Sequence, residues 1–385
     1  MSSTVLPEPP PVVRVRDAAL HAVDGPVRVT VSRLSAPERV ADRLASAGGR
    51  STVAHGRLTA VTTPSRLVDA TGRALGREPA EALEDALAAA LDAWSAPSPD
   101  LEARGAVLPT AERTVVMGVL NVTPDSFSDG GQWYDPDKHP GLAVEHGRAL
   151  AAAGADIVDV GGESTRPGAE PVDLDEELNR AIPVVEGLAS DGIAVSIDTR
   201  KAAVAEAAVE AGAILVNDVS GGGADPDMFG VVARSGAGYV AMHMRGDPQS
   251  MQDDPRYADV VAEVFDHLAE ALEHAVAAGI DPQRIAIDPG IGFAKTAAHN
   301  LSLLRRTREL TSLGRPVLVG VSRKSFIGSV SGVKEPEERL EGSLAAAAVA
   351  VALGASMVRA HDVDETLRAV RIARAIGTAP VADVD

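Results

Sequence analysis

Polar side chains that could do chemistry recur along the chain, each directly after a short apolar run. Asp198, Asn217 and Asp288 are three of them. Their carboxylate and amide groups can form paired hydrogen bonds, so they suit a planar heterocycle whose edge carries an N–C–N group. These residues therefore indicate a pocket for a flat ring.

A second set of residues at similar places is cationic. Its members are Arg166, Lys324, Arg359 and His361. Such a set could bind an anionic group such as a diphosphate. Asn121 and the acidic loop after it, with Asp125 and Asp129, could orient a hydrated Mg²⁺, because this ion needs few protein ligands when phosphates supply the rest. A ring at one end and a phosphate at the other describe a substrate with a leaving group.

The composition excludes several other chemistries. The 385 residues include no Cys, so cysteine nucleophiles, thiolate metal sites and disulfides are ruled out. No serine has an adjoining base, and no spacing of His, Asp or Glu indicates a zinc site. The net charge of -19 argues against nucleic-acid binding. No apolar run reaches membrane-spanning length and the first residues lack a secretory layout, so we expect a cytoplasmic protein.

Eight short runs rich in Val, Ile and Met must position the polar side chains. They span residues 114–120, 156–162, 193–199, 213–219, 238–244, 284–290, 316–322 and 356–362. Helical patterns separate them, and this alternation predicts a (β/α)₈ TIM barrel, an α/β fold; an open doubly wound sheet is the alternative. Active sites of such barrels lie where the strands end, so the polar residues would converge there. His243 also ends a run, and we expect it to pack or to bond a loop.

A small α/β domain is expected before the barrel. Residues 1–24 are Pro-rich and lack periodicity, which is typical of a flexible lead-in. Within residues 25–105, the alternating Val27, Val29 and Val31 predict a strand, and the stretch from Ser35 to Glu38 predicts a capping box that opens a helix. The barrel would then occupy residues 106–385.

Seven motifs in order resemble the dihydropteroate synthase family, over about residues 112–377. They are NVTPDSFSDGG, DVGGESTRPGA, SIDT, VNDVSG, IDPGIGFAKT, VGVSRKSFIG and VRAHDV. The resemblance implies condensation of 6-hydroxymethyl-7,8-dihydropterin diphosphate with p-aminobenzoate, which yields 7,8-dihydropteroate and pyrophosphate for folate synthesis. It also implies dependence on Mg²⁺, a homodimer and sensitivity to sulfonamides. One departure is Ala294, which stands where many members have Gly.

The resemblance implies a role for each matched residue. Pterin would be bound by Asp198, Asn217, Asp288 and Lys324. The diphosphate would be surrounded by Asn121, Thr165, Arg166, Arg359 and His361. p-Aminobenzoate would be framed by Phe127, Pro167, Phe293 and Ser325. Asn121 would ligate Mg²⁺, and the catalytic residues would be Asp125, Lys324, Arg359 and His361.

Two other interpretations of the whole chain stay open. A pterin-binding methyltransferase barrel would share the ring-binding acids, but it would not need Lys324, Arg359 and His361 together with the NVTPDSFSDGG loop. A catalytically silent paralogue would bind pterin only, or act as an assembly partner. For Arg359 and His361 themselves, a structural role is the alternative: Arg359 could pair with an acidic neighbour, and His361 could cap the helix that begins near Asp362.

Overall fold

A computed structural model describes residues 11–18, 27–47, 49–123, 140–164, 169–246 and 251–379. The chain forms two compact units. One comprises residues 1–97 with 308–314, and the other comprises residues 98–307 with 315–385. The division after Pro97 falls before the expected boundary near residue 105. In the described part of the chain, no helix has the length and apolarity needed to cross a membrane.

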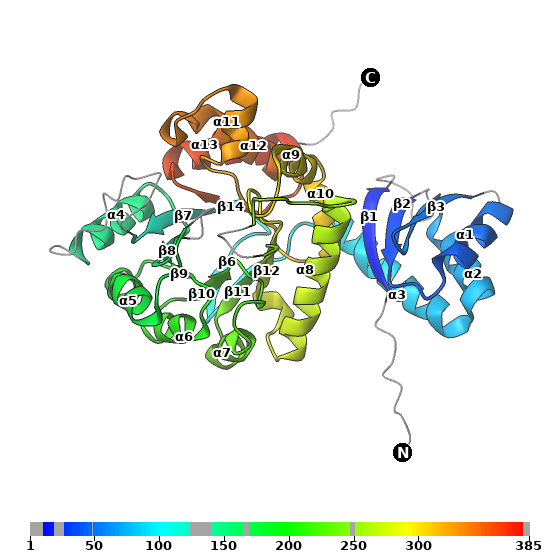
Figure 1. Ribbon diagram of the computed structural model, residues 1–385, viewed down its shortest axis with the longest axis horizontal. Coiled ribbons are helices and arrows are strands. Elements are labelled where there is room, and N and C mark those ends of the chain that lie inside the picture. Colours follow the sequence, from blue (N-terminus) through cyan, green and yellow to red (C-terminus); the bar gives the residue numbers. More distant parts are fainter. Residues whose placement is uncertain are drawn as a thin grey trace, which may run out of the picture. The chain divides into compact units, whose positions relative to one another are not determined.

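The smaller unit is an antiparallel sheet with helices packed against it (Figure 1). The sheet has the strand order β1-β2-β4-β3. Its strands are β1 (Val12–Ala18), β2 (Val27–Ser32), β3 (Arg50–Ala54) and β4 (Arg57–Thr62). Its helices are α1 (Pro37–Ser46), α2 (Pro64–Leu75) and α3 (Arg77–Ser95). Buried Val, Leu and Ala side chains from the sheet and the helices form one core.

Two details of this unit correct the sequence prediction. Strand β1 lies inside residues 1–24, which were expected to form a lead-in. The alternation of apolar and polar residues in β1 is short. The pairing of β1 with β2 also shifts register between Val15 and Asp17, so the sequence shows no clear period of two. The capping box is also wrong, because the N-cap of α1 is Ala36 and no side chain caps it.

A distant chain segment completes the smaller unit. It belongs to residues 308–314 and contains most of α10 (Thr307–Leu310) and the 3₁₀ turn η2 (Thr311–Leu313). Glu309 Oε2 lies 3.3 Å from Arg14 Nε, and both side chains are buried. The Ser312 hydroxyl accepts a hydrogen bond from the backbone N–H of Val15 at 3.2 Å. The unit is therefore built from two separate stretches of the chain.

The larger unit is a barrel of eight parallel strands, so the fold prediction is confirmed. The strand order is β12-β11-β10-β9-β8-β7-β14-β13. A parallel bridge between Ile287 and Val317 joins the two ends of this order and closes the ring, which rules out the open sheet. The strands are β7 (Val115–Asn121), β8 (Ile157–Gly161), β9 (Val195–Asp198), β10 (Leu215–Asp218), β11 (Gly238–Met242), β12 (Ile285–Asp288), β13 (Leu318–Gly320) and β14 (Met357–Ala360).

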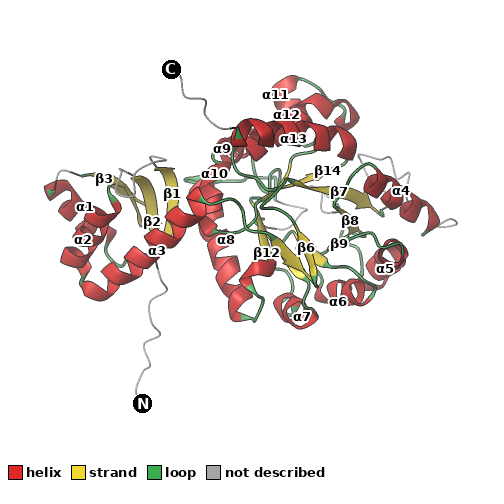
Figure 2. Cartoon of the chain, turned by 180° about the vertical axis from the view of Figure 1, so that it is seen from behind, coloured by secondary structure: helices red, strands yellow, loops and turns green. Residues whose placement is uncertain are grey.

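Helices surround the barrel strands (Figure 2). They are α4 (Gly141–Ala152), α5 (Leu174–Ser190), α6 (Ala202–Glu210), α7 (Met228–Ser235), α8 (Val260–Ala277), α9 (Ala297–Arg305), α11 (Ser325–Ser331), α12 (Leu340–Ala352) and α13 (Val363–Thr378), with 3₁₀ turns η1 (Pro282–Arg284) and η3 (Pro336–Glu338). Several helices begin at a side-chain cap. Asp173 accepts from the backbone N–H of Glu176 at 2.8 Å, for example, which satisfies one free donor in the first turn of α5.

A short hairpin packs inside the barrel at the strand starts. It consists of β5 (Leu101–Ala103) and β6 (Ala106–Leu108). Leu101 and Leu108 share a core cluster with Met117, Leu215 and Met357, which lie at or near the first residue of their strands. The hairpin thus closes the end where the strands begin, and the end where they finish is left for a site.

Candidate functional site

Four polar side chains meet inside the barrel near the strand ends. Arg359 on β14 donates from Nε to Asp159 Oδ2 at 2.6 Å and from Nη2 to Asp198 Oδ2 at 2.8 Å. Asn217 on β10 donates from Nδ2 to the same oxygen of Asp159 at 2.9 Å. The strand-end convergence expected for Asp198, Asn217 and Arg359 is therefore present, with Asp159 at its centre.

The electrostatics of this group favour a ligand that brings hydrogen-bond donors. Burial raises the pKa of Asp198 to about 7; Asp159 acts in the same direction, whereas Arg359 opposes it. Burial alone would lower the pKa of Arg359, but the two carboxylates outweigh this effect and raise it, so the guanidinium stays charged. Oδ1 of Asp159 and Oδ1 of Asp198 are both buried, and neither has a hydrogen-bond partner among the described residues. Such oxygens are costly unless a ligand supplies donors.

Asp288, Phe293 and Lys324 form the neighbouring wall. Asp288 accepts a hydrogen bond from the backbone N–H of Gly290 at 2.7 Å, and burial raises its pKa to about 6, against the effect of Lys324. Lys324 Nζ lies 4.3 Å from the centre of the Phe293 ring, a cation–π distance. Its stem passes Gly292, where a Cβ would lie 3.1 Å from Lys324 Cδ and where φ is +88°, so glycine suits this position on two counts.

Asn121 is the last residue of the first barrel strand, β7, and His361 directly follows the last barrel strand, β14. His361 Nδ1 lies 3.0 Å from the hydroxyl of Ser322, which also accepts from the backbone N–H of His361 at 3.2 Å. Asn121 ends β7 beside Gly161, at which a Cβ would lie 3.8 Å from Asn121 Oδ1 and 3.5 Å from Asp198 Cβ. Asn121 therefore adjoins the Asp198 side of the site. Ser325, the first residue of α11, is exposed next to Lys324.

The structure bears directly on the structural alternative for Arg359 and His361. Arg359 does pair with acidic neighbours, as that alternative expected. His361, however, is not the cap of α13, because the N-cap residue is Asp362 and it makes no side-chain cap hydrogen bond. Pairing engages Nε and Nη2 of Arg359, whereas within the described part of the chain Nη1 remains available to an anion. An ion-paired Arg359 can therefore still contact a phosphate.

Six residues named from the sequence lie outside the described residues. They are Asp125, Phe127, Asp129, Thr165, Arg166 and Pro167. Their contacts with the described site therefore stay predictions.

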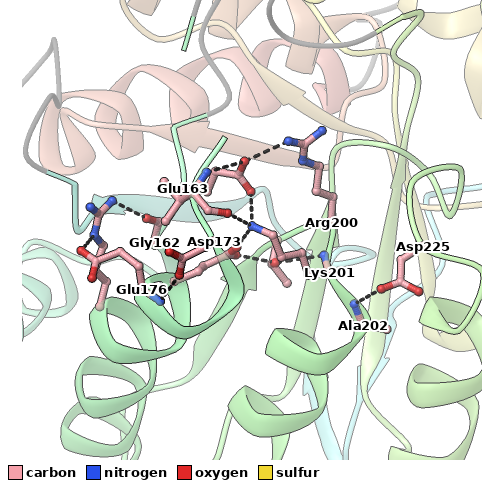
Figure 3. Close-up of polar contacts among 12 residues, drawn as sticks. Gly162, Glu163, Asp173, Glu176, Arg200, Lys201, Ala202 and Asp225 are labelled. Carbon is pink, nitrogen blue, oxygen red and sulfur yellow. Dashed lines mark hydrogen bonds and ion pairs between the residues drawn. The ribbon is translucent and has the colours of Figure 1, made fainter. Parts of the chain in front are cut away.

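A partly buried ionic network joins the turn after Asp198 to the connection between β8 and α5 (Figure 3). Lys201 donates to Glu163 Oε2 at 2.7 Å, to the Val172 carbonyl at 2.8 Å and to Glu177. Arg200 donates to Glu163 Oε1 at 2.9 Å. Burial raises the pKa of Glu177, and the Lys201 ammonium opposes this. Lys201 and Glu177 were not predicted as buried partners, because charged residues next to or within a helix are usually solvated.

A second buried network fixes the loop that carries Phe293. Lys295 is 3 % exposed and contacts His243 Nδ1 and the Phe293 carbonyl, both at 2.9 Å. Burial lowers the pKa of Lys295 to about 7 and that of His243 far below its usual value, so His243 is neutral and accepts the bond. His243 therefore bonds a loop, as expected. Ala294 in this loop has φ 50°, a left-handed conformation that explains why glycine is the less strained residue there.

A cavity of about 430 Å³ lies at the other end of the barrel, where the strands begin. Its lining includes Arg113 and Asp156, which form an ion pair at 2.5 Å. None of the residues predicted to bind substrate contributes to this lining. The strand ends, rather than this cavity, carry the candidate site.

Known proteins resemble this chain over its barrel. The family described as "Pterin binding enzyme" matches residues 117–361. Dihydropteroate synthase of Mycobacterium leprae is 50% identical over 263 residues, which is 67% of this chain and 91% of that protein. The Escherichia coli K12 dihydropteroate synthase is 46% identical over 263 residues, covering 68% and 90%.

Solved structures agree with these relatives. Yersinia pestis dihydropteroate synthase with a sulfonamide drug superimposes with a TM-score of 0.69 at 43% identity, covering 73% of this chain and 100% of that one. Xanthomonas albilineans dihydropteroate synthase with 4-aminobenzoic acid gives a TM-score of 0.67 at 46% identity, covering 74% and 100%. The chain therefore belongs to the dihydropteroate synthase family of transferases.

Proposed function

We propose that the strand-end residues divide the dihydropteroate synthase reaction between a ring end and a leaving-group end. The observation that carries this proposal is the buried Asp198 Oδ1, which has no donor among the described residues and lies beside an ion-paired arginine. A dihydropterin ring supplies N–H donors to such an oxygen.

The ring end would comprise Asp198, Asn217, Asp288 and Lys324. Asn217 gives its Nδ2 to Asp159, so its own carbonyl oxygen is presented as an acceptor for a ring N–H. Burial raises the pKa of both Asp198 and Asp288, and the Lys324 ammonium opposes this rise. Lys324 would also donate to an acceptor on the ring. The raised pKa values of these aspartates also mean that a ligand donor competes with a bound proton.

The leaving-group end would comprise Arg359, His361 and Asn121, with Thr165 and Arg166 as further predicted members. The bond between the exocyclic methylene carbon and the diphosphate oxygen breaks, and the negative charge that grows on the diphosphate is stabilised by these fixed donors. The pterin delocalises the cation left behind, and Asp125 is predicted to stabilise it. The neutral arylamine nitrogen then bonds to the methylene carbon and releases its proton, so no strong base is needed.

p-Aminobenzoate would bind against Phe293 and Ser325, with Phe127 and Pro167 as predicted partners. Solved relatives hold 4-aminobenzoic acid or a sulfonamide drug, and a sulfonamide copies the arylamine and the anionic end. We expect sulfonamides to inhibit competitively with p-aminobenzoate. Steady-state kinetics at several p-aminobenzoate concentrations check this. An apparent inhibition constant that does not rise with p-aminobenzoate concentration, together with a lower maximal rate, would contradict it.

Mg²⁺ is a proposed cofactor, and Asn121 fits it as a single protein ligand. Among the described residues, no group of three or more His, Asp or Glu side chains could hold a metal ion. A lone amide oxygen still suits Mg²⁺, which keeps several waters and binds substrate phosphates. When bound, the ion would neutralise part of the diphosphate charge.

A homodimer is proposed from exposed apolar side chains on α12 and α13. Val349 is 51% exposed, Ile372 64% and Ile376 71%, and the two helices pack against each other. Exposed apolar side chains on two helices that pack against each other are a candidate interface, and a second copy of the chain would cover them. Light scattering measures the mass that tests this. The cytoplasmic location stays a prediction from the sequence.

Pyrophosphate release is the experiment that tests the function. The wild-type protein should release pyrophosphate only when both substrates are present, which neither a silent paralogue nor a methyltransferase does. Arg359→Ala should lower kcat and kcat/KM for the pterin diphosphate roughly ten- to a thousandfold, because it removes a cation that stabilises the leaving group. Normal turnover by this variant at saturating substrate would show that Arg359 has only a structural role.

A further inference from the structure

We propose that Asp159 is a positioning residue that sets the ring end and the leaving-group end of the site together. The inference rests on the proposed roles of Asn217 and Arg359. Asp159 itself received no role from the sequence, although it lies in a strand that leads into the site. It is fully buried, at 0% exposure.

One oxygen of Asp159 serves both ends. Oδ2 accepts from Arg359 Nε at 2.6 Å and from Asn217 Nδ2 at 2.9 Å. The two donors come from β14 and β10, which lie on opposite sides of β8 in the strand order. Asp159 is therefore the only described residue that hydrogen-bonds both side chains through a single atom.

The bond to Asn217 decides which way its amide faces. An amide group has a donor side and an acceptor side, and each can point either way unless a neighbour selects one. A carboxylate only accepts, so it selects the NH₂ side of Asn217. The carbonyl side is then left for a ring N–H, which is the arrangement that the proposed pterin contact needs.

The bond to Arg359 fixes the plane of its guanidinium. Asp159 accepts from Nε and Asp198 accepts from Nη2, which are adjacent donors of the planar guanidinium group. The direction of Nη1, which is proposed to face the diphosphate, is thereby set. A residue without an acceptor at position 159 would hold Arg359 at one point only, through Asp198.

A carboxylate at position 159 presents only acceptors to its two donors, and its charge strengthens the bond to Arg359. Asparagine would keep the size of Asp159 but could present its own NH₂ group to Arg359 or to Asn217, where a donor would face a donor. The charge-assisted bond to Arg359 would also weaken. Asp159→Asn is therefore a test that alters charge and polarity with little change in volume.

The test uses two probes that each occupy one end of the site. 6-Hydroxymethyl-7,8-dihydropterin without a diphosphate occupies the ring end, and pyrophosphate with Mg²⁺ occupies the other. We expect Asn217→Ala to weaken only the pterin probe and Arg359→Ala mainly the pyrophosphate probe. Asp159→Asn should weaken both by roughly tenfold, the change typical of one charge-assisted hydrogen bond. Calorimetry measures each affinity.

Double variants decide whether Asp159 acts through its two partners. The pterin loss in Asp159→Asn/Asn217→Ala should be smaller than the sum of the single losses, and so should the pyrophosphate loss in Asp159→Asn/Arg359→Ala. Asp218→Asn is the matched control: Asp218 is also fully buried, but it accepts from its own loop and from Tyr239, so it should lower stability without this coupling.

Several outcomes would overturn the inference. Asp159→Asn affinities within twofold of wild type would do so, as would losses that add in both cycles. If Asp159→Asn does not fold, Asp159→Glu keeps the charge but moves it by one methylene, and unaltered affinities in that variant would count equally against the proposal. A wild-type protein that releases no pyrophosphate would instead sink the proposed function, so the two failures are distinguishable.

Discussion

At the scale of single residues, the sequence predicted site members better than it predicted their partners. Asp198, Asn217 and Arg359 could be named because a polar residue after an apolar run is visible locally. The same local pattern marks Asp159, but its role, like that of Lys295, depends on contacts with residues far along the chain, which no local pattern records. Six predicted residues lie outside the part of the chain that the structure describes, so their roles stay predictions.

Asp198 should make stability depend on pH in a defined window. Burial raises its pKa from 3.8 to about 7 in the folded protein, so the folded state holds its proton more tightly than the unfolded state. The stability that Asp198 contributes through this proton is fully present below about pH 4, and it is lost as the pH rises through about 7. Relative to Asp198→Asn, wild-type unfolding free energy should fall between these values, by at most about 1.4 kcal/mol per pH unit.

Wild type must be compared with Asp198→Asn because two histidines change the unfolding free energy with pH in the opposite direction. Burial lowers the pKa of His243 and of His267, so their contribution rises with pH in the acid range. Both histidines are present in wild type and in Asp198→Asn, and their effects cancel in the difference. Urea unfolding at several pH values measures it. Parallel curves for the two proteins would show that Asp198 does not titrate in this window.

At the scale of elements, long apolar runs were predictable and short or irregular ones were not. All eight barrel strands fall on the eight runs, because strands buried on both faces leave a continuous apolar signal. Strand β1 carries a register shift, and β5 and β6 have three residues each. Such elements depend on their partners for stability, so their own sequences carry little signal.

Lys201 joins the start of α6 to α5 and to the segment before it, so replacing Lys201 should destabilise the fold. Glu177 is fully buried and Lys201 is its charged partner, so Lys201→Met leaves an uncompensated carboxylate. We expect a loss of roughly 3 kcal/mol in unfolding free energy. Chemical denaturation measures it. Adding Glu177→Gln should recover part of the loss, because a neutral amide costs less to bury than a charge.

An exposed ion pair supplies the control for Lys201. Arg234 lies 3.2 Å from Glu206, and both side chains are more than half exposed. Arg234→Met should therefore change the unfolding free energy by less than about 1 kcal/mol. Equal effects of Lys201→Met and Arg234→Met would mean that the network in Figure 3 behaves as a solvated surface pair.

At the scale of the whole molecule, the position of the domain boundary follows from the hairpin. The stretch from Ser95 to Asp100 was interpreted as a linker, with the barrel beginning at residue 106. The division instead falls after Pro97, and β5 belongs to the larger unit. A barrel expressed from residue 106 would lose Leu101, which is 0% exposed in the barrel core. Removing residues 1–97 also removes the partners of residues 308–314.

Leu101→Ala in the full chain tests this view of the barrel. The side chain lies among Leu108, Met117 and Val240, so its truncation should leave a cavity and cost about 2–5 kcal/mol. Val107 lies on the same hairpin but is 57% exposed, and Val107→Ala should cost less than about 1 kcal/mol. Thermal and urea unfolding measure both. Because the two substitutions share the hairpin, a difference between them reports core packing rather than hairpin stability. If their effects are equal, the hairpin is not part of the core and the boundary near residue 105 is the better one.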